Sequence, residues 1–257
     1  FSGGLSMNVK ANMLIAELTN KYDKPFFPAP SGDDYSHCIS AAFLDGNDQE
    51  QQISNDVKPG VLDNLYLGYN FNDDDDKCIS RWANKHKWKI IKPDIKEIAS
   101  QLADGAILAL CHGKAEFGAR ALGNRSIIAD PGDVNTIRRI NLAIKKRDFW
   151  MPFAPSILEG YENEYFDQIE PKMHYFMASC ARTTQVGEKL LRAATHAYDG
   201  TARPQIVNSK TNYFYASIIK AFGDETGTYA LLNTSLNLHG YPIVNDAEDL
   251  IFVMENS

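Results

Sequence analysis

Apolar side chains recur every three or four residues in several stretches of the chain, as they do in amphipathic helices. The clearest stretch follows Asp94, where Ile95, Ile98 and Leu102 fall on one helical face. Asp94 is suited to cap such a helix, and Gly105 is suited to end it. Similar patterns predict helices over 12–22, 38–44, 94–102, 135–147 and 212–222, and a further helix through 82–83 that follows the acidic run 73–76.

Short apolar runs between these helices predict strands. Residues 105–110 form a continuous apolar run, which is typical of a strand buried in a sheet. The polar stretch 46–64, punctuated by Gly and Pro, is expected to be a linker. Strands that alternate with helices indicate an α/β domain with a mixed sheet. The remaining strands are expected at 24–34, which runs into a turn, and at 126–129, 151–158, 174–181 and 228–232.

Composition excludes several classes of protein. The 257 residues are 44% hydrophobic and 23% charged, so the chain can bury a core and is not globally disordered. A net charge of −7 argues against a surface that coats nucleic acid or an anionic membrane. No apolar run approaches the ~18 residues that span a bilayer. The four cysteines lie far apart, so we expect reduced thiols in a cytoplasmic protein.

The charge is unevenly distributed. Residues 110–147 carry eight basic and three acidic side chains, a local charge of +5 within an acidic chain. A basic island of this kind can attract a small anion. A solvated basic helix face is the alternative, because helical spacing places Arg138 and Lys145 on one face of the expected helix 135–147.

A loop rich in glycine and cations follows the expected strand 105–110. Residues 113–131 contain three glycines near Lys114, Arg120 and Arg125. Glycine permits close approach of the backbone to a bound group, and arginine offers a fork of donors to phosphate or carboxylate. Strand ends of α/β sheets are common anion sites. The loop has neither the phosphate-binding P-loop pattern nor the dinucleotide fingerprint.

The loop also carries a resemblance to a known family. Residues 114–126 (Lys-Ala-Glu-Phe-Gly-Ala-Arg-Ala-Leu-Gly-Asn-Arg-Ser) resemble the central signature of the O-carbamoyltransferases of the nodulation and antibiotic-biosynthesis type. Further blocks that are similar to this family follow in the expected order, and the resemblance covers nearly the whole chain. These blocks are 2–8, 30–33, 141–148 with 152–158, 196–205 and 232–244.

The resemblance implies a two-domain enzyme. Residues 1–62 would be the tail of an actin-like domain plus a linker, and 63–257 a YrdC-like α/β domain truncated at its C-terminus. In such enzymes the YrdC-like domain makes carbamoyl-adenylate from carbamoyl phosphate and ATP with Mg²⁺. The actin-like domain, which carries iron or another divalent metal, passes the carbamoyl group to an acceptor hydroxyl, for example of a sugar. We expect a fragment of such a protein.

The resemblance also implies the site residues. Arg120, Lys145, Arg203 and Ser235 are the expected catalytic residues. Asp33 corresponds to a metal ligand of the first domain, whose partner histidines would lie upstream of this chain. The residues expected to bind substrate or nucleotide are Gly3, Gly4, Asn8, Lys114, Gly118, Gly123, Arg125, Ser126, His196 and Asn233.

Each of these residues also has a purely structural interpretation. Arg120 could pair with Glu116, and Arg203 could pair with Asp199. Arg125 could be a surface cation. Lys145 could be a solvated helix residue, and the glycines could only punctuate turns. Asn233 and Ser235 are expected just after the strand 228–232, where they could cap the next turn.

The sequence departs from the family pattern at Met151, where the family usually has arginine. This substitution removes one cation. A catalytically inactive domain is therefore a further alternative. A nucleotide- or RNA-binding module without catalysis is the alternative function. RNA affinity of such a module would fall steeply with salt. Nucleic acid is not the expected partner, because the chain lacks a basic stripe interleaved with aromatic residues.

Overall fold

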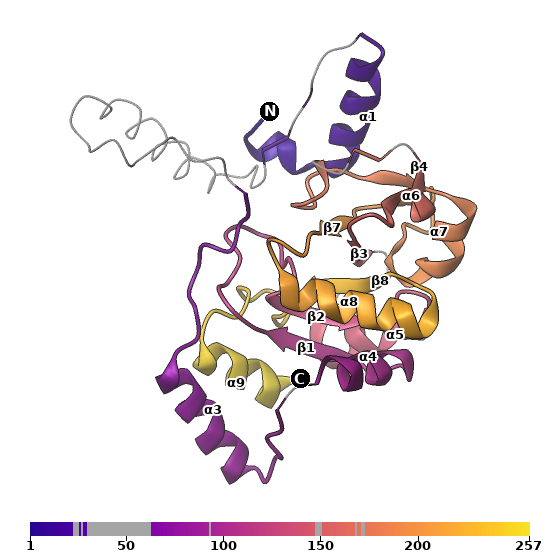
Figure 1. Ribbon diagram of the computed structural model, residues 1–257. Helices are drawn as coiled ribbons and strands as arrows, with labels where there is room; N and C mark the ends of the chain where they lie inside the picture. Colours follow the sequence, from indigo (N-terminus) through magenta and orange to yellow (C-terminus); the bar gives the residue numbers. More distant parts are fainter. Residues whose placement is uncertain are drawn as a thin grey trace, which may run out of the picture.

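The computed structural model describes residues 1–22, 26, 28–29, 63–92, 94–146, 151–167, 169–170 and 173–257 (Figure 1). The expected helix 38–44, most of the expected strand 24–34, nearly all of the linker 46–64 and the metal-ligand candidate Asp33 lie outside these residues. No helix in the described parts of the chain is long and apolar enough to cross a membrane.

A five-stranded mixed sheet forms the centre of the fold, in the order β1-β2-β8-β3-β7. The pairs β1/β2, β2/β8 and β8/β3 are antiparallel, whereas β3 and β7 are parallel. The predicted mixed α/β sheet is therefore confirmed. The strands are β1 (Leu108–Cys111), β2 (Arg125–Ala129), β3 (Ala154–Leu158), β7 (Gln205–Val207) and β8 (Ala230–Ser235).

Two helices cover one face of this sheet. They are α4 (Ile95–Ala103) and α8 (Tyr213–Thr226), which lies across the sheet in Figure 1. Ile218 and Phe222 of α8 are buried with Leu102 of α4 against Ile128 and Leu231 of the sheet. Burial of such side chains contributes about 1.5–3 kcal/mol each. The predicted helical stripes of both segments are confirmed.

The opposite face packs against a different set of elements. Ile127 and Leu232 alternate with Ile128 and Leu231 along their strands and so point to this side. They form a core with Ile140. The covering elements are α5 (Asn135–Ile140), the π-helical turn η2 (Asn141–Lys145) and α9 (Ala247–Asn256). The sheet is thus enclosed between two helical layers.

A smaller antiparallel sheet, in the order β4-β5-β6, packs beside the main sheet. Its strands share a core with Ile157 of β3 and Ile206 of β7. Helix α3, which begins with the acidic run, lies beside α9 in Figure 1. The remaining elements are η1 (Gly4–Met7), α1 (Val9–Asn20), α3 (Asp73–Lys85), α6 (Glu162–Tyr165), β4 (Phe166–Asp167), β5 (Ala181–Thr183), α7 (Gln185–Leu190), η4 (Arg192–Ala194) and β6 (Thr201–Ala202).

Three sequence predictions differ from the structure. The predicted strand 174–181 is wrong, because these residues form turns that lead into β5. The strand predicted at 105–110 exists as β1, but it is the edge strand of the sheet and Ala109 is exposed. Asn233 and Ser235 lie within β8, which runs three residues beyond the predicted end. Their side chains are therefore oriented by the sheet rather than by a turn.

The predicted helix 135–147 changes its winding partway, and this change reverses one prediction. Lys146 N donates to Asn141 O at 2.7 Å, a bond that spans five residues and marks the π turn. The extra residue rotates the following side chains relative to α5. Arg138, which precedes the π turn, is exposed, whereas Lys145 at its end is only 3% exposed. The alternative interpretation, in which these two cations share a solvated helix face, is wrong.

Candidate functional site

The glycine-rich loop between β1 and β2 is held together by a carboxylate. Oε1 of Glu116 accepts hydrogen bonds from three backbone N–H groups, of Leu122 at 2.6 Å, Asn124 at 2.8 Å and Arg125 at 3.2 Å. Burial raises the pKa of Glu116, and the backbone donors oppose that shift. Glu116 therefore closes the loop that carries Arg120.

Arg125 ties the loop to its surroundings and is neither a surface cation nor a member of the clefts described below. It is fully buried, and Nη1 donates to the carbonyl oxygens of His112 at 3.0 Å and Gly113 at 3.1 Å. Nη2 donates to the carbonyls of Tyr69 and Asn245 at 3.2 and 3.3 Å. The surface-cation interpretation is wrong, and the guanidinium is occupied by the backbone.

Gly123 and Ser126 also serve the loop itself. Gly123 has φ +110°, and a Cβ atom there would lie 2.2 Å from the ring of Tyr215. The glycine thus allows close approach of an aromatic ring rather than of a ligand. Ser126 is buried and its Oγ accepts a hydrogen bond from Gly123 N at 3.0 Å. Neither residue faces the clefts that the other predicted site residues share.

Four predicted site residues from three separate segments line one small cleft. Arg120 comes from the loop, Arg203 from the segment between β6 and β7, and Asn233 and Ser235 from β8. The cleft has a volume of about 90 Å³. Pro152 and Phe153, which follow Met151 in the chain, line it as well. The structure therefore brings together residues that are up to 115 positions apart in the sequence.

A wider cleft of about 530 Å³ adjoins the small one, because Ala119 and Ser235 line both. Gly118, with φ +102°, lines the wider cleft on the loop side. Tyr241, which is exposed, and Asn237 line it as well, from the segment after β8. Neither was predicted from sequence, although both fall in the block 232–244.

Lys145 reaches the same strand end from the π turn. Its Nζ donates to Ser235 O, to Ser235 Oγ at 3.2 Å and to Asn237 O at 3.1 Å, and it also contacts Asn237 Oδ1. Ser235 Oγ in turn donates to Asn237 Oδ1 at 2.7 Å. The ammonium group is thus fixed beside Ser235, one of the two residues that line both clefts.

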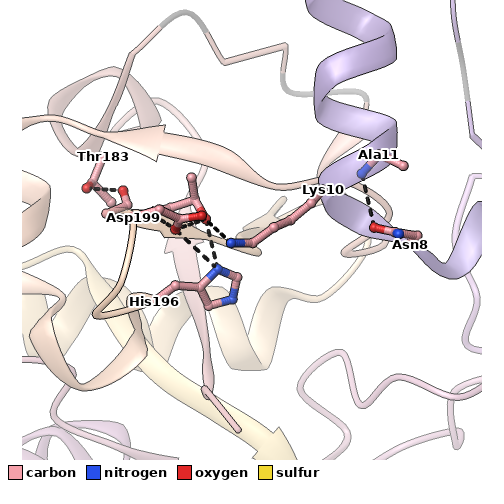
Figure 2. Close-up of polar contacts among 8 residues, drawn as sticks. Asn8, Lys10, Ala11, Thr183, His196 and Asp199 are labelled. Carbon is pink, nitrogen blue, oxygen red and sulfur yellow. Dashed lines mark hydrogen bonds and ion pairs between the residues drawn. The ribbon is translucent and has the colours of Figure 1, made fainter. Parts of the chain in front are cut away.

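His196 lies in a polar cluster near the N-terminus of α1. Figure 2 shows Lys10 of that helix in contact with Asp199. His196 Nδ1 is 2.8 Å from Thr201 Oγ1 and 3.9 Å from Asp199 Oδ1. Lys10 and Thr201 occupy the Asp199 carboxylate, and the hydrogen bond from Lys10 lowers the pKa of Asp199 to about 2. Burial and the charge of Lys10 lower the pKa of His196. This cluster holds the segment 196–203 in place, and Arg203, at the end of that segment, lines the small cleft.

The other predicted site residues lie apart from the clefts. Asn8 caps α1, since its Oδ1 accepts from Ala11 N at 3.0 Å, as Figure 2 shows. Gly3 and Gly4 begin the 3₁₀ turn before it. Lys114 has an exposed side chain. Among the described residues, no three His, Cys, Asp or Glu side chains group closely enough to hold a metal ion.

Fold and site together define a mixed α/β domain with two arginines in a small cleft beside a buried lysine. Residues 99–257 match the family model described as "Carbamoyltransferase C-terminus". The chain belongs to this carbamoyltransferase family.

Several curated relatives match almost the whole chain. It is 39% identical to the uncharacterized protein MJ1058 of Methanocaldococcus jannaschii, over 97% of this chain and 40% of that protein. It is 33% identical to the nodulation protein NolNO of Sinorhizobium fredii, over 97% of this chain and 36% of that protein. It is 32% identical to 3'-hydroxymethylcephem-O-carbamoyltransferase of Amycolatopsis lactamdurans, over 99% of this chain and 45% of that protein. The chain thus spans less than half the length of these relatives.

Among solved structures, the chain matches full-length HypF in a phosphate- and nucleotide-bound form. The two are 20% identical with a TM-score of 0.46, over 65% of this chain and 20% of HypF.

Proposed function

We propose that this chain forms the carbamoyl-adenylate site of an ATP-dependent O-carbamoyltransferase. The observation that carries the proposal is the convergence of Arg120, Arg203, Asn233 and Ser235 on one small cleft, with Lys145 bonded to Ser235. Cations of this kind, held at fixed positions, stabilise the charge that develops on phosphoryl oxygens during transfer.

The sizes of the two clefts suit the two parts of this intermediate. The small cleft of about 90 Å³ corresponds to roughly three water volumes. A planar carbamate has four heavy atoms and fits such a space together with phosphoryl oxygens at its mouth. The wider cleft of about 530 Å³ is in the range that holds a drug-sized molecule, and we assign it to the nucleoside.

The proposed reaction needs little covalent chemistry from the protein. Carbamate, released with inorganic phosphate when water cleaves carbamoyl phosphate, attacks the α-phosphorus of ATP through an oxygen. The bond to the β-phosphate breaks, and pyrophosphate leaves with Mg²⁺ as its counter-ion. Arg120 and Arg203 would hold the negative oxygens, and the ammonium group of Lys145, which Ser235 and Asn237 hold in place, would add positive charge beside them.

The second half of the reaction belongs to the remainder of the protein in this proposal. A hydroxyl-bearing small molecule, such as a sugar, would accept the carbamoyl group from carbamoyl-adenylate. A relative is named for O-carbamoylation of a hydroxymethyl group, which supports a hydroxyl acceptor. Iron or another divalent metal in the actin-like domain, with Asp33 as one ligand, remains part of the proposal. None of the steps proposed for carbamoyl-adenylate formation depends on this metal.

Exchange of labelled pyrophosphate into ATP by the full-length protein tests the proposal. Carbamoyl phosphate should be required, and Arg120→Ala or Arg203→Ala should lower the exchange rate at least 100-fold. Arg192→Ala, an exposed arginine outside both clefts, is the control. Met151→Arg restores the cation that the family usually has at this position. Its exchange rate shows whether the absence of this cation limits the unmodified protein. Absence of exchange with any divalent metal would overturn the proposal, and salt-sensitive RNA binding would then support the alternative module.

A further inference from the structure

Asn233 of β8 carries a buried amide with an unused acceptor. The residue is 1% exposed and lines the small cleft. Its Nδ2 lies 3.1 Å from Ala121 O, 3.0 Å from Ser156 Oγ and 3.1 Å from Gln205 Oε1. These acceptors take up both amide hydrogens. Its Oδ1 is equally buried and has no hydrogen-bond partner among the residues that the structure describes.

Two backbone carbonyls fix the orientation of this amide. Ala121 O can only accept, so the atom of Asn233 that faces it must be the NH₂ nitrogen. Gln205 is oriented in the same way, because its Nε2 donates to Leu122 O at 2.7 Å. Gln205 Oε1 therefore faces Ser156 and Asn233, and it accepts from Ser156 Oγ at 2.7 Å. Rotating the Asn233 amide by 180° would place its Oδ1 against the carbonyl oxygen of Ala121, so two acceptors would be in contact.

A buried acceptor without a partner is destabilising, and such groups in native proteins call for an explanation. A ligand with an N–H group in the cleft would satisfy Oδ1 without disturbing Ala121, Ser156 or Gln205. The arginines of the cleft cannot distinguish one small carboxylate from another, because they act on the oxygens that all of them share.

We propose that Asn233 Oδ1 accepts a hydrogen bond from the carbamoyl NH₂ and so selects carbamate against acetate-like acids of the same shape. This inference rests on the proposed function. A methyl group in place of the NH₂ would leave Oδ1 buried and unpaired. Sites built to bond a polar group reject the analogue that lacks it far more strongly than apolar sites reject a change in size.

Two stable adenylate mimics that differ only in this group test the inference. The probes are 5′-O-(N-carbamoylsulfamoyl)adenosine and 5′-O-(N-acetylsulfamoyl)adenosine, with Kd measured by calorimetry on the full-length protein. We expect the carbamoyl mimic to bind 10- to 100-fold more tightly. Asn233→Leu, which is similar in size and lacks the acceptor, should bind both mimics equally. Gln205→Met, which disturbs the same network but keeps Oδ1, should weaken both and retain the preference.

These measurements distinguish a failure of the role of Asn233 from a failure of the proposed function. Equal Kd values for the two mimics on the unmodified protein would overturn the role of Asn233 while leaving the adenylate site intact, even if the Asn233→Leu variant fails to fold. A preference that survives in Asn233→Leu would also overturn it. If neither mimic binds the unmodified protein, the proposed function itself fails.

Discussion

The ammonium group of Lys145 lies 3.2 Å from the hydroxyl of Ser235, across 90 residues of sequence. This contact joins the π turn after α5 to the end of β8, on the boundary between the small and the wider cleft. It places a cation at the point where a phosphoryl group would bridge the two clefts.

Lys145→Met should therefore abolish adenylation with little change in fold. Methionine keeps the length of the buried stem but cannot donate to Ser235 or Asn237. We expect pyrophosphate exchange to fall at least 100-fold, and the free energy of unfolding to fall by about 1–3 kcal/mol because the strand-end acceptors lose a donor. Lys146→Met, at the exposed neighbouring position, should change neither quantity appreciably. Full exchange activity in Lys145→Met would contradict the role of the lysine.

Glu116 should act by positioning Arg120. Glu116→Ala leaves the N–H groups of Leu122, Asn124 and Arg125 without their shared acceptor, so the loop should lose its fixed shape. We expect the KM for ATP to rise about tenfold or more, and the loop amides to exchange hydrogen faster. Glu116→Gln retains one carbonyl oxygen and should recover most of both properties. A Gln variant as impaired as the Ala variant would point to a need for the charge itself.

Gly123 should be the most substitution-sensitive glycine of the loop. Gly123→Ala combines a positive φ with a Cβ placed 2.2 Å from the Tyr215 ring. Strain and overpacking together should lower the free energy of unfolding by about 3 kcal/mol or more in urea titrations. Gly240→Ala is the matched control, because φ is +82° there but nothing lies within 4 Å of the new Cβ. It should cost only about 1 kcal/mol. Similar losses for the two variants would show that the ring contact is unimportant.

His174 should make the fold sensitive to mild acid. Burial lowers the pKa of His174 to about 4, so the native state keeps it neutral. Between pH 6.5 and pH 4 the unfolded chain binds a proton that the native state does not, and the free energy of unfolding should fall by up to about 3 kcal/mol. His174→Leu should flatten this slope in urea titrations at several pH values. His239→Leu, at an exposed turn, is the control. An unchanged slope in His174→Leu would assign the acid sensitivity to other groups.

Much of the fold was predictable because it depends on local periodicity. The stripe of Ile95, Ile98 and Leu102, with Asp94 accepting from Lys96 N at 2.9 Å, indicated α4 almost to the residue. The run 174–181 misled because its apolar side chains, such as Met177 with φ +57°, are buried in turns rather than in a strand. Burial without regular structure leaves no period in the sequence.

The sequence predicted several residues of the candidate site, but not which of them line a cleft and which hold the loop in place. Arg120 and Arg125 look alike in the sequence, yet one lines a cleft and the other is held by carbonyls of three distant segments. Only long-range packing decides between these outcomes. The same is true of Asp199, whose partner Lys10 lies 189 residues away.

The π-helical turn η2 contains one residue more than a turn of α-helix. This extra residue sets the direction in which the side chain of Lys145 points. If the same residues wound as an ordinary α-helix, with none removed, the side chain of Lys145 would turn toward the exposed face that Arg138 occupies. A change in winding alone, with no residue of either cleft replaced, would then separate the ammonium group from Ser235.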